Sequence, residues 1–473
     1  MEEAKTGLRQ SFGLKMAIIL VVSSIIGSGV FKKVAPMSEQ LLSPSLVMLA
    51  WVLAGVIILF GVLSIGELGA MFPESGGAFY WLEKAYGKTI AFLYGWSCFT
   101  VIQTAAIASV AYVFAGALGT FIDLPHLSPH LETFTVFGII QPFDNIGAKV
   151  ITSLLLILLT IVNIRGAKQG GLVSQIFTYT IVFCILVVVA LSLSSTVGTF
   201  SNLTTSSSTY PPESFTTTFG FISIMVVAMR SAFWGYEGWI ALGFIGEEIE
   251  NPKKNLPKAM TLGIVAIIVI YLLANFAYLY VMPIDELINS LKADKNLIAA
   301  VVVVDKIFGN GGALVVSGMI LISTFGCTNA TILLSSRIYY AMSKDKIFFK
   351  GASKTHPKNQ TPANALIYQC IWGCILIFSG SFDLLTDLVV IVGFVFYALV
   401  VGAVIILRYK NKDEIRPIKA FGYPIVQIIF ILFCIVLIAV SIEESPEKSI
   451  LGLFLIFNGL PFYYYWKAKN QII

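Results

Sequence analysis

Charge, histidine and long polar stretches are scarce in this sequence, and each shortage excludes a class of protein. Charged residues make up 12% of the 473 residues, whereas globular domains carry about 25%. None of the three histidines falls within a long apolar segment, and no constellation of side chains suits a metal or a nucleophile. No polar stretch is long enough for a soluble domain. We therefore expect a membrane protein that is not an enzyme and holds neither a metal nor a cofactor.

Cysteine is also sparse, and its placement excludes a disulfide framework. The six cysteines all lie in apolar segments, and none lies in a predicted outer loop. We therefore expect no disulfide-linked partner subunit. The net charge of +5 comes from Lys and Arg in one set of loops, so it does not indicate nucleic-acid binding.

Apolar residues, by contrast, make up 57% of the chain. A hydrocarbon core about 30 Å thick needs roughly 20 apolar residues per helix, and twelve segments qualify. This predicts an all-α polytopic membrane protein with 12 transmembrane helices that lie in the lipid bilayer. The predicted spans are 14–35, 45–69, 91–120, 148–164, 172–193, 219–245, 259–282, 311–341, 363–380, 384–407, 420–441 and 449–466.

The positions of Lys and Arg predict the orientation of these spans. With the N-terminus inside, the cytoplasmic segments hold 23 of these residues and the outer segments hold 7; Arg230, within a span, completes the total of 31. Cytoplasmic loops carry the excess of Lys and Arg in membrane proteins. Both termini are therefore predicted to be cytoplasmic, in a protein of the plasma or inner membrane.

Two glycine-containing stretches interrupt apolar spans in the two halves of the chain. They are Ile-Ile-Gly-Ser-Gly-Val-Phe at 25–31 and Phe-Trp-Gly-Tyr-Glu-Gly-Trp at 233–239. Glycine costs about 1 kcal/mol against alanine inside a helix, so both stretches predict a break. Lipid tolerates non-helical backbone only where protein buries it or where it lines a wet cavity. A pair of such breaks in corresponding positions indicates the binding site of a transporter.

The two breaks also predict an internal repeat. Five spans separate the start of the first span from the start of the sixth, so the second half enters the membrane from the opposite side. The N–H groups of the half-helix after Gly27-Ser28-Gly29 suit a carboxylate, and unpaired carbonyls at 23–26 and 232–235 suit an ammonium group. Together they describe a site for a zwitterionic amino acid. Alternatively, the glycines only allow close helix packing.

Short motifs follow in order along the chain. They are Ile26-Gly27-Ser28-Gly29-Val30-Phe31, Gly66-Glu67-Leu68, Pro73-Glu74-Ser75-Gly76-Gly77, Trp234-Gly235-Tyr236-Glu237-Gly238-Trp239, Glu247-Glu248, Asn251-Pro252, Leu256-Pro257, Ser335-Ser336-Arg337 and Arg416-Pro417-Ile418-Lys419. With these motifs the sequence resembles the amino acid–polyamine–organocation (APC) superfamily, and within it the L-type amino acid transporter branch.

The resemblance implies a fold and an activity. The fold is a five-plus-five inverted repeat of LeuT type, with helices 1 and 6 broken and two extra C-terminal helices. The activity is sodium-independent transport or exchange of neutral amino acids. The resulting division of the chain is a cytoplasmic N-terminal segment (1–13), a first repeat (14–193), an extracellular Ser/Thr-rich loop (194–218), a second repeat (219–407), and spans 11–12 with a cytoplasmic C-terminus (408–473).

The resemblance also implies roles for residues at the two breaks. Ser24, Ser28 and Gly29 would hold the substrate carboxylate. Trp234 would be an aromatic gate, and Gly235 and Glu237 would line the pocket. The candidate substrate-binding residues are Ser24, Ile26, Gly27, Ser28, Gly29, Phe233, Trp234, Gly235, Tyr236 and Glu237.

The sequence departs from the family pattern in its charges. Many members carry a fifth-span lysine in the place of a sodium ion, but Ile181 falls there in this chain. Ser323 and Thr324 could coordinate a cation instead, or their hydroxyls could bond to the preceding helical turn. Arg230 lies deep in the sixth span, where a charge needs a cavity or a partner. It could pair with Glu237, lie in an outer vestibule beside the predicted gate, or extend toward outside water.

Three functions remain to be compared. The leading prediction is a secondary transporter, a permease or exchanger of neutral L-amino acids that works by alternating access. A proton- or cation-coupled transporter of cationic amino acids or polyamines is the alternative. A channel is disfavoured, because the sequence has no ring-forming filter motif and a pair of broken helices suits occlusion better than a pore.

Overall fold

The computed structural model describes residue 8 and residues 10–135, 141–293, 298–309, 311–379 and 382–470, and at 214, 382 and 383 it describes the backbone only. Most of the predicted N-terminal segment 1–13 therefore lies outside the described residues. Within them the regular structure is helical, and the all-α prediction is confirmed. The α-helices are α1 (Leu14–Ile25), α2 (Gly29–Lys32), α3 (Val34–Leu41), α4 (Pro44–Met71), α5 (Ala78–Tyr86), α6 (Lys88–Ser97), α7 (Gln103–Leu118), α8 (Pro129–Glu132), α9 (Ile146–Ile164), α10 (Ala167–Ser194), α11 (Ser201–Thr204), α12 (Thr218–Tyr236), α13 (Pro252–Val281), α14 (Ile284–Ala293), α15 (Ala299–Phe308), α16 (Gly312–Lys344), α17 (Ala363–Ser379), α18 (Phe382–Lys410), α19 (Ile425–Glu444), α20 (Pro446–Phe457) and α21 (Gly459–Asn470).

Short helices of other types join some of these elements. A single π-helical turn, η1 (Cys98–Ile102), connects α6 to α7, and a 3₁₀ segment, η3 (Ala241–Glu248), follows α12. The 3₁₀ turns η2 (Glu213–Thr216) and η4 (Lys350–Ser353) lie in loops. π-helical turns inside α-helices often mark functional sites, and η1 directly precedes Gln103.

Nine helical runs in the described part of the chain are long and apolar enough to cross a membrane. They include the continuous runs Lys88–Leu118 and Thr218–Glu248. The apolar helices α1 and α17 are shorter. A polytopic membrane protein is therefore supported, and the count of twelve spans stays a prediction.

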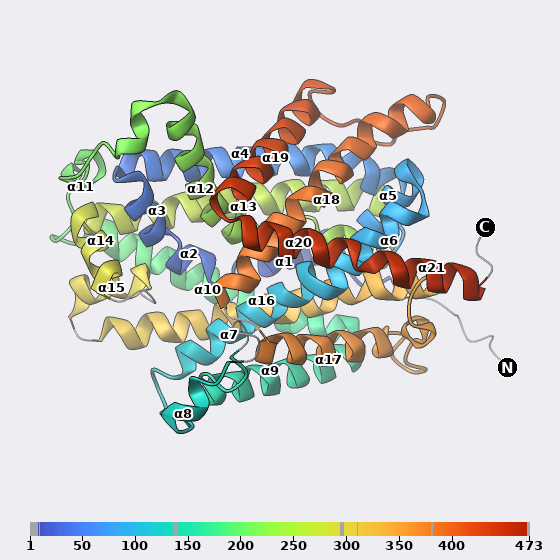
Figure 1. Ribbon diagram of the computed structural model, residues 1–473, viewed down its shortest axis with the longest axis horizontal. Helices are drawn as coiled ribbons and strands as arrows, with labels where there is room; N and C mark the ends of the chain where they lie inside the picture. Colours follow the sequence, from blue (N-terminus) through green and yellow to red (C-terminus); the bar gives the residue numbers. More distant parts are fainter. Residues whose placement is uncertain are drawn as a thin grey trace.

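The long helices run mostly along the long axis of the molecule (Figure 1). α4 packs against α13, and α10 packs against α16. The short helix α1 contacts α13, α10 and α16, so the first span lies among the long helices. Buried apolar side chains from all of these helices form one continuous core.

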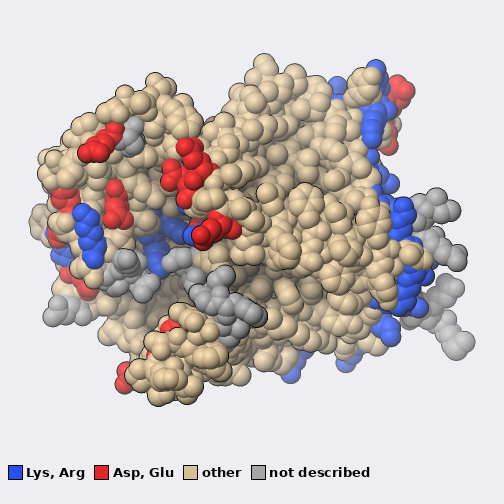
Figure 2. All heavy atoms as spheres, viewed as in Figure 1, with Lys and Arg blue, Asp and Glu red and all other residues tan. Residues whose placement is uncertain are grey.

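The two ends of this bundle differ in charge. In Figure 2, Lys and Arg side chains gather along the right-hand end, where Figure 1 shows the end of α21. We call this the basic end, and the opposite one the far end. A concentration of Lys and Arg at one end is the pattern that the orientation rule for membrane proteins describes.

Glu67, near the last turn of α4, ties the C-terminal helices to the bundle. Its buried carboxylate accepts hydrogen bonds from Arg408 Nε at 3.0 Å, from Arg416 Nε at 3.1 Å and from the backbone N–H of Ala420 at 2.7 Å. Because two guanidinium groups and an amide hold it, this carboxylate has a structural role.

A second buried ion pair joins α16 to the segment after α12. Arg337 donates through Nε and Nη2 to the Glu248 carboxylate at 2.6 and 2.9 Å, and both side chains are no more than 2% exposed. The Glu248 carbonyl accepts the backbone N–H groups of Ser11 and Phe12. Phe12 also forms a parallel β-bridge with Ile249. These contacts fasten the start of the chain to the end of η3.

Candidate functional site

The first break lies between α1 and α2. α1 ends at Ile25, Ile26 has extended backbone angles (φ −71°, ψ 91°), and α2 begins at Gly29. Lys33, which joins α2 to α3, has helical backbone angles (φ −77°, ψ −15°), so the backbone stays close to helical from Gly29 to Leu41. Three residues, 26–28, therefore separate two helical segments.

The second break follows α12. That helix ends at Tyr236, Glu237 has φ −58° and ψ 145°, and Gly238 has φ +99°. A positive φ favours glycine, and a side chain at 238 would also meet the Ser24 carbonyl oxygen at 2.5 Å. Gly238 thus brings the second break against the end of α1.

Two further contacts hold the breaks together. A Cβ on Gly29 would lie 2.6 Å from the Cα of Gly235, so this approach of α2 to α12 requires glycine at position 29. The Tyr271 hydroxyl, from α13, lies 3.0 Å from the Ile25 carbonyl oxygen and 2.8 Å from that of Gly235. One hydroxyl group therefore lies within hydrogen-bond distance of carbonyl oxygens at the ends of both helices.

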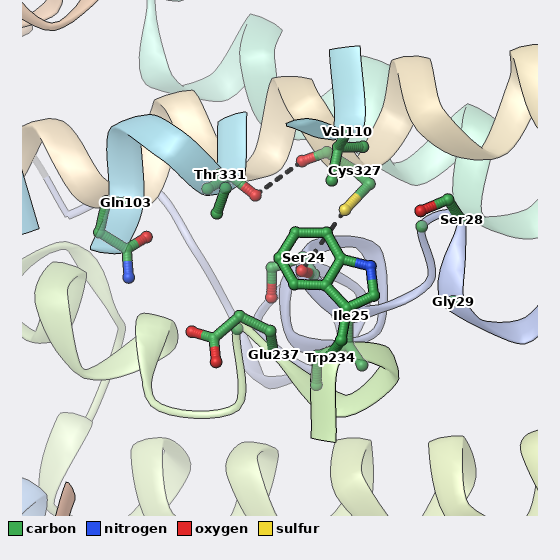
Figure 3. Close-up of a pocket in the computed structure, with 13 residues that line it drawn as sticks. Ser24, Ile25, Ser28, Gly29, Gln103, Val110, Trp234, Glu237, Cys327 and Thr331 are labelled. Atoms are coloured by element: carbon green, nitrogen blue, oxygen red, sulfur yellow. Dashed lines mark hydrogen bonds between the residues drawn. The ribbon is translucent and has the colours of Figure 1, made fainter. Parts of the chain in front are cut away.

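A small cavity lies between the breaks (Figure 3). Its volume is about 30 Å³, which is room for about two water molecules. Figure 3 shows the Trp234 indole in the middle of the lining residues, with Glu237 near one side of the ring and Cys327 near the other. The cavity is lined by Ser24, Ile25, Gly27, Ser28, Gly29, Gln103, Ala106, Val110, Trp234, Glu237, Gly238, Cys327 and Thr331.

Six of the ten candidate substrate-binding residues are among the lining residues. The surroundings of two of these side chains are informative. The Ser28 hydroxyl is buried and finds no partner among the described residues, and Glu237 Oε1 accepts a hydrogen bond from the Tyr397 hydroxyl at 2.6 Å. The six lining residues are Ser24, Gly27, Ser28, Gly29, Trp234 and Glu237.

The other four candidates contact protein rather than the cavity. Phe233 packs between Phe394 and Phe433, with ring centroids at 4.7 and 5.3 Å. Tyr236 packs against the rings of Trp51 and Tyr271. The remaining two are Ile26, whose carbonyl accepts the Ser323 hydroxyl, and Gly235, which contacts Gly29.

Seven lining residues are absent from the sequence-based set: Ile25 and Gly238 lie at the two breaks, and the other five come from two other helices. Gln103, Ala106 and Val110 lie on α7, and Cys327 and Thr331 lie on α16. Gln103 is 2% exposed and starts α7 directly after the π-helical turn η1. A lone amide in an apolar span is a signal for a functional position, so Gln103 could have been found from sequence.

The two hydroxyls proposed for a cation behave differently. Ser323 Oγ lies 3.0 and 3.1 Å from the carbonyl oxygens of Ile26 and Gly27, so it satisfies the first break directly. Thr324 Oγ1 donates to the Ile320 carbonyl at 2.6 Å, one helical turn earlier, as threonines in helices commonly do. Ile181, at the position compared with the family lysine, is buried on α10.

The ion pair considered between Arg230 and Glu237 does not form in the described structure. The expectation assumed that α12 continues to residue 237, which would place both side chains on one face. α12 ends at Tyr236 instead, and the Glu237 carboxylate meets Tyr397. No ion pair of Arg230 occurs within the described residues, and its Nη1 atom is buried without a hydrogen-bond acceptor there.

The sequence model of one protein family matches almost the whole chain. The pattern described as amino acid permease matches residues 12–459. The chain belongs to the amino acid permease family. It is therefore an amino acid transporter with several membrane spans, and its resemblance to the APC superfamily is confirmed.

Several known transporters align with nearly the whole chain. The Bacillus subtilis (strain 168) serine/threonine exchanger SteT is 29% identical over 472 residues, which cover 99% of this chain and 100% of that protein. The Rattus norvegicus b(0,+)-type amino acid transporter 1 is 30% identical over 470 residues, 98% of this chain and 89% of the relative. The Homo sapiens large neutral amino acids transporter small subunit 2 is 28% identical over 478 residues, 98% of this chain and 82% of the relative. These relatives confirm the resemblance to the L-type branch.

Proposed function

We propose that this protein exchanges small neutral amino acids across the plasma or inner membrane by alternating access, binding each one in the cavity between the two breaks. The observation that carries the proposal is the direct contact of α2 with α12 at Gly29 and Gly235. Because of it, backbone groups from both breaks border one cavity. A related exchanger bears serine and threonine in its name, and substrates of that size and polarity suit this site.

The two charges of the substrate would be bound by different groups. The backbone N–H groups at 27–29 and the hydroxyls of Ser24 and Ser28 would hold the carboxylate, since the start of a helix favours an anion. Carbonyl oxygens at the ends of α1 and α12 would accept the ammonium group, because each can take a second hydrogen bond. Gln103 and Thr331 would face the substrate side chain.

The size of the cavity is consistent with exchange between conformations. The cavity between the breaks has room for about two water molecules, which is less than an amino acid needs, so the helices must separate to admit it. Trp234, which lines the cavity on α12, would move as a gate during this step. The contacts of Glu248 with Arg337 and with the start of the chain would hold the basic end closed while the other end admits substrate.

We further propose the twelve-span, five-plus-five inverted arrangement with both termini cytoplasmic. The gathering of Lys and Arg at the basic end supports this orientation (Figure 2). The two breaks lie in the first and sixth predicted spans, as an inverted repeat requires. We also propose that no disulfide-linked subunit is needed, since all six cysteines are buried or half-buried in the described helices.

One observation favours a second candidate function. The Glu237 carboxylate lines the cavity, and in the described residues it has a hydroxyl partner, Tyr397, but no cationic one. A carboxylate in such a place would attract the side-chain ammonium or guanidinium of a cationic amino acid. Transport of lysine or arginine is therefore the alternative to transport of serine or threonine.

Counterflow into liposomes that hold the purified protein and unlabelled L-serine tests both candidates. We expect saturable uptake of labelled L-serine, with little uptake of the D-isomer and no requirement for sodium. L-Serine should be preferred to L-lysine in the wild type and in Glu237→Gln. Flux that neither saturates nor distinguishes isomers would overturn the proposal in favour of a channel.

The same panel detects the second candidate. If Glu237 binds a cationic side chain, the wild type takes up L-lysine, and Glu237→Gln loses that uptake by about tenfold or more, because a hydrogen bond to a charged group contributes about 1.5–3 kcal/mol. Serine uptake by the variant serves as the control for folding.

A further inference from the structure

Arg230 is a deeply placed cation that the proposed cavity does not use. It lies twelve residues from Thr218, where α12 begins, which is about 18 Å along the helix. Its side chain is half-buried, and Nη1 is fully buried with no acceptor among the described residues. A cation at such depth normally faces a partner or a water-filled cavity, so the surroundings of Arg230 matter.

Arg230 lies on the approach to the gate. It precedes Trp234 by four residues on α12, so the two side chains share one helical face, with Arg230 one turn nearer the far end. Along α12, the half-buried positions Phe221, Ile224 and Val227 lead from the helix start toward Arg230, whereas Phe219 and Ile222 are exposed. A half-buried stripe that ends at Trp234 fits the wall of an entry path.

Two lysines lie at the same level as Arg230. The chain directions of α2 and α12 are opposite, so both helices extend toward the far end from their contact at Gly29 and Gly235, and α12 also contacts α3. Lys33 is four residues beyond Gly29, and Arg230 is five residues before Gly235. At 1.5 Å per residue, these positions are about 6 and 7.5 Å from the contact, both toward the far end. Lys32 and Lys33 are half-buried as well.

The surface of the molecule agrees with this placement. Figure 2 shows a hollow near the far end, with Lys and Arg side chains inside it and Asp and Glu side chains on its border, over the region where Figure 1 shows α2. Since few Lys and Arg lie in the predicted outer segments, a group of them in a hollow stands apart from the overall charge pattern. These Lys and Arg side chains favour an anion inside the hollow, past its acidic border.

We propose that Arg230, with Lys32 and Lys33, forms an outer station that binds the carboxylate of the amino acid before it passes Trp234. The proposal rests on the proposed function, since the ligand is the transported substrate. A guanidinium binds a carboxylate through two parallel hydrogen bonds, and the buried Nη1 provides one such donor. The lysines add positive charge that draws the carboxylate into the hollow.

The test compares substrate affinity from the two faces of the membrane. Right-side-out and inside-out vesicles from the same cells would be assayed for exchange of L-serine by the wild type, Arg230→Met and Arg230→Lys. We expect Arg230→Met to raise the KM from the predicted outer face about tenfold. The KM from the opposite face and the maximal rate should stay within about twofold, and Arg230→Lys should recover most of the loss.

Two controls make the result specific. Lys292→Met removes an exposed positive charge on α14 and should leave both KM values unchanged. Raising the ionic strength should increase the outer KM of the wild type more than that of Arg230→Met, because salt screens a distant charge. An Arg230→Met protein that fails to fold would be replaced by Arg230→Gln, judged by the same comparison of faces.

The remaining outcomes contradict the station. Equal rises of KM on both faces would place Arg230 in the central site or in the fold, and no change on either face would show that it contacts only water or lipid. If the wild type exchanges no amino acid, the proposed function fails instead. The two failures are therefore distinguishable.

Discussion

Replacing Gly29 with valine is expected to abolish transport while the protein still inserts into the membrane. A Cβ at position 29 would lie 2.6 Å from the Cα of Gly235 and 3.2 Å from its nitrogen, and neither atom belongs to a flexible side chain. The two helices must therefore separate. Overpacking of this kind costs about 1–3 kcal/mol, and a shift of about 1 Å at a binding site can reduce its rate about a hundredfold.

The measurement is serine counterflow in liposomes, with the amount of inserted protein determined in parallel. Gly116→Val is the matched control, because Gly116 also lies within an apolar helix but a Cβ there meets nothing within 4 Å. That variant should retain transport. Wild-type rates in Gly29→Val would show that the approach of α2 to α12 does not define the site.

The second large effect concerns the buried ion pair at the basic end. Arg337→Met or Glu248→Gln should each lower the free energy of unfolding by about 3–5 kcal/mol, because each leaves one charge buried without its partner. The double variant should lose less than the sum of the two single losses, since the charges interact directly. Thermal unfolding of the purified proteins in detergent, compared in a double-mutant cycle, measures the difference.

An ion pair at the surface provides the comparison. Lys306 and Glu286 pair with side chains 27% and 47% exposed, and such pairs contribute about 0–1 kcal/mol. Lys306→Met should therefore have a small effect. Strictly additive losses for Arg337→Met and Glu248→Gln would mean that the pair seen at 2.6 and 2.9 Å does not stabilise the fold.

Local patterns in the sequence predict much of this molecule. Apolar runs predict the helices, and the glycines at 27, 29 and 238 lie where the chain leaves α1 and α12. The reason is that hydropathy and glycine preference act within a few residues. The short motifs also predict the family, whereas the contacts between motifs depend on the folded chain. Glu248 and Arg337 come from two separate motifs and meet only in the folded protein.

The remaining features depend on tertiary contacts that no local pattern encodes. Thr331 and Cys327 line the cavity because α16 packs beside α1, and the spacing of the apolar residues does not reveal which helices are neighbours. The pairing of Arg230 with Glu237, one of the alternatives for this arginine, is not made in the described structure for a local reason. Because α12 ends at Tyr236, Glu237 has non-helical backbone angles, and its side chain meets Tyr397 on α18.

Protection of Cys327 by substrate tests most directly whether the amino acid binds between the breaks. Cys327 lines the cavity, and its Sγ lies 3.5 Å from the Ser24 carbonyl oxygen. The experiment uses a variant in which Cys327 is the only cysteine and which still transports L-serine. Its alkylation by N-ethylmaleimide is followed over time, and a variant that keeps only Cys184, which does not line the cavity, is the control.

L-Serine at about ten times its dissociation constant should slow the labelling of Cys327 about tenfold, by mass action. D-Serine should have no effect, and the labelling of Cys184 should not change with either isomer. If L-serine saturates counterflow but leaves the labelling rate of Cys327 unchanged, the substrate does not bind in this cavity, and the central claim is contradicted.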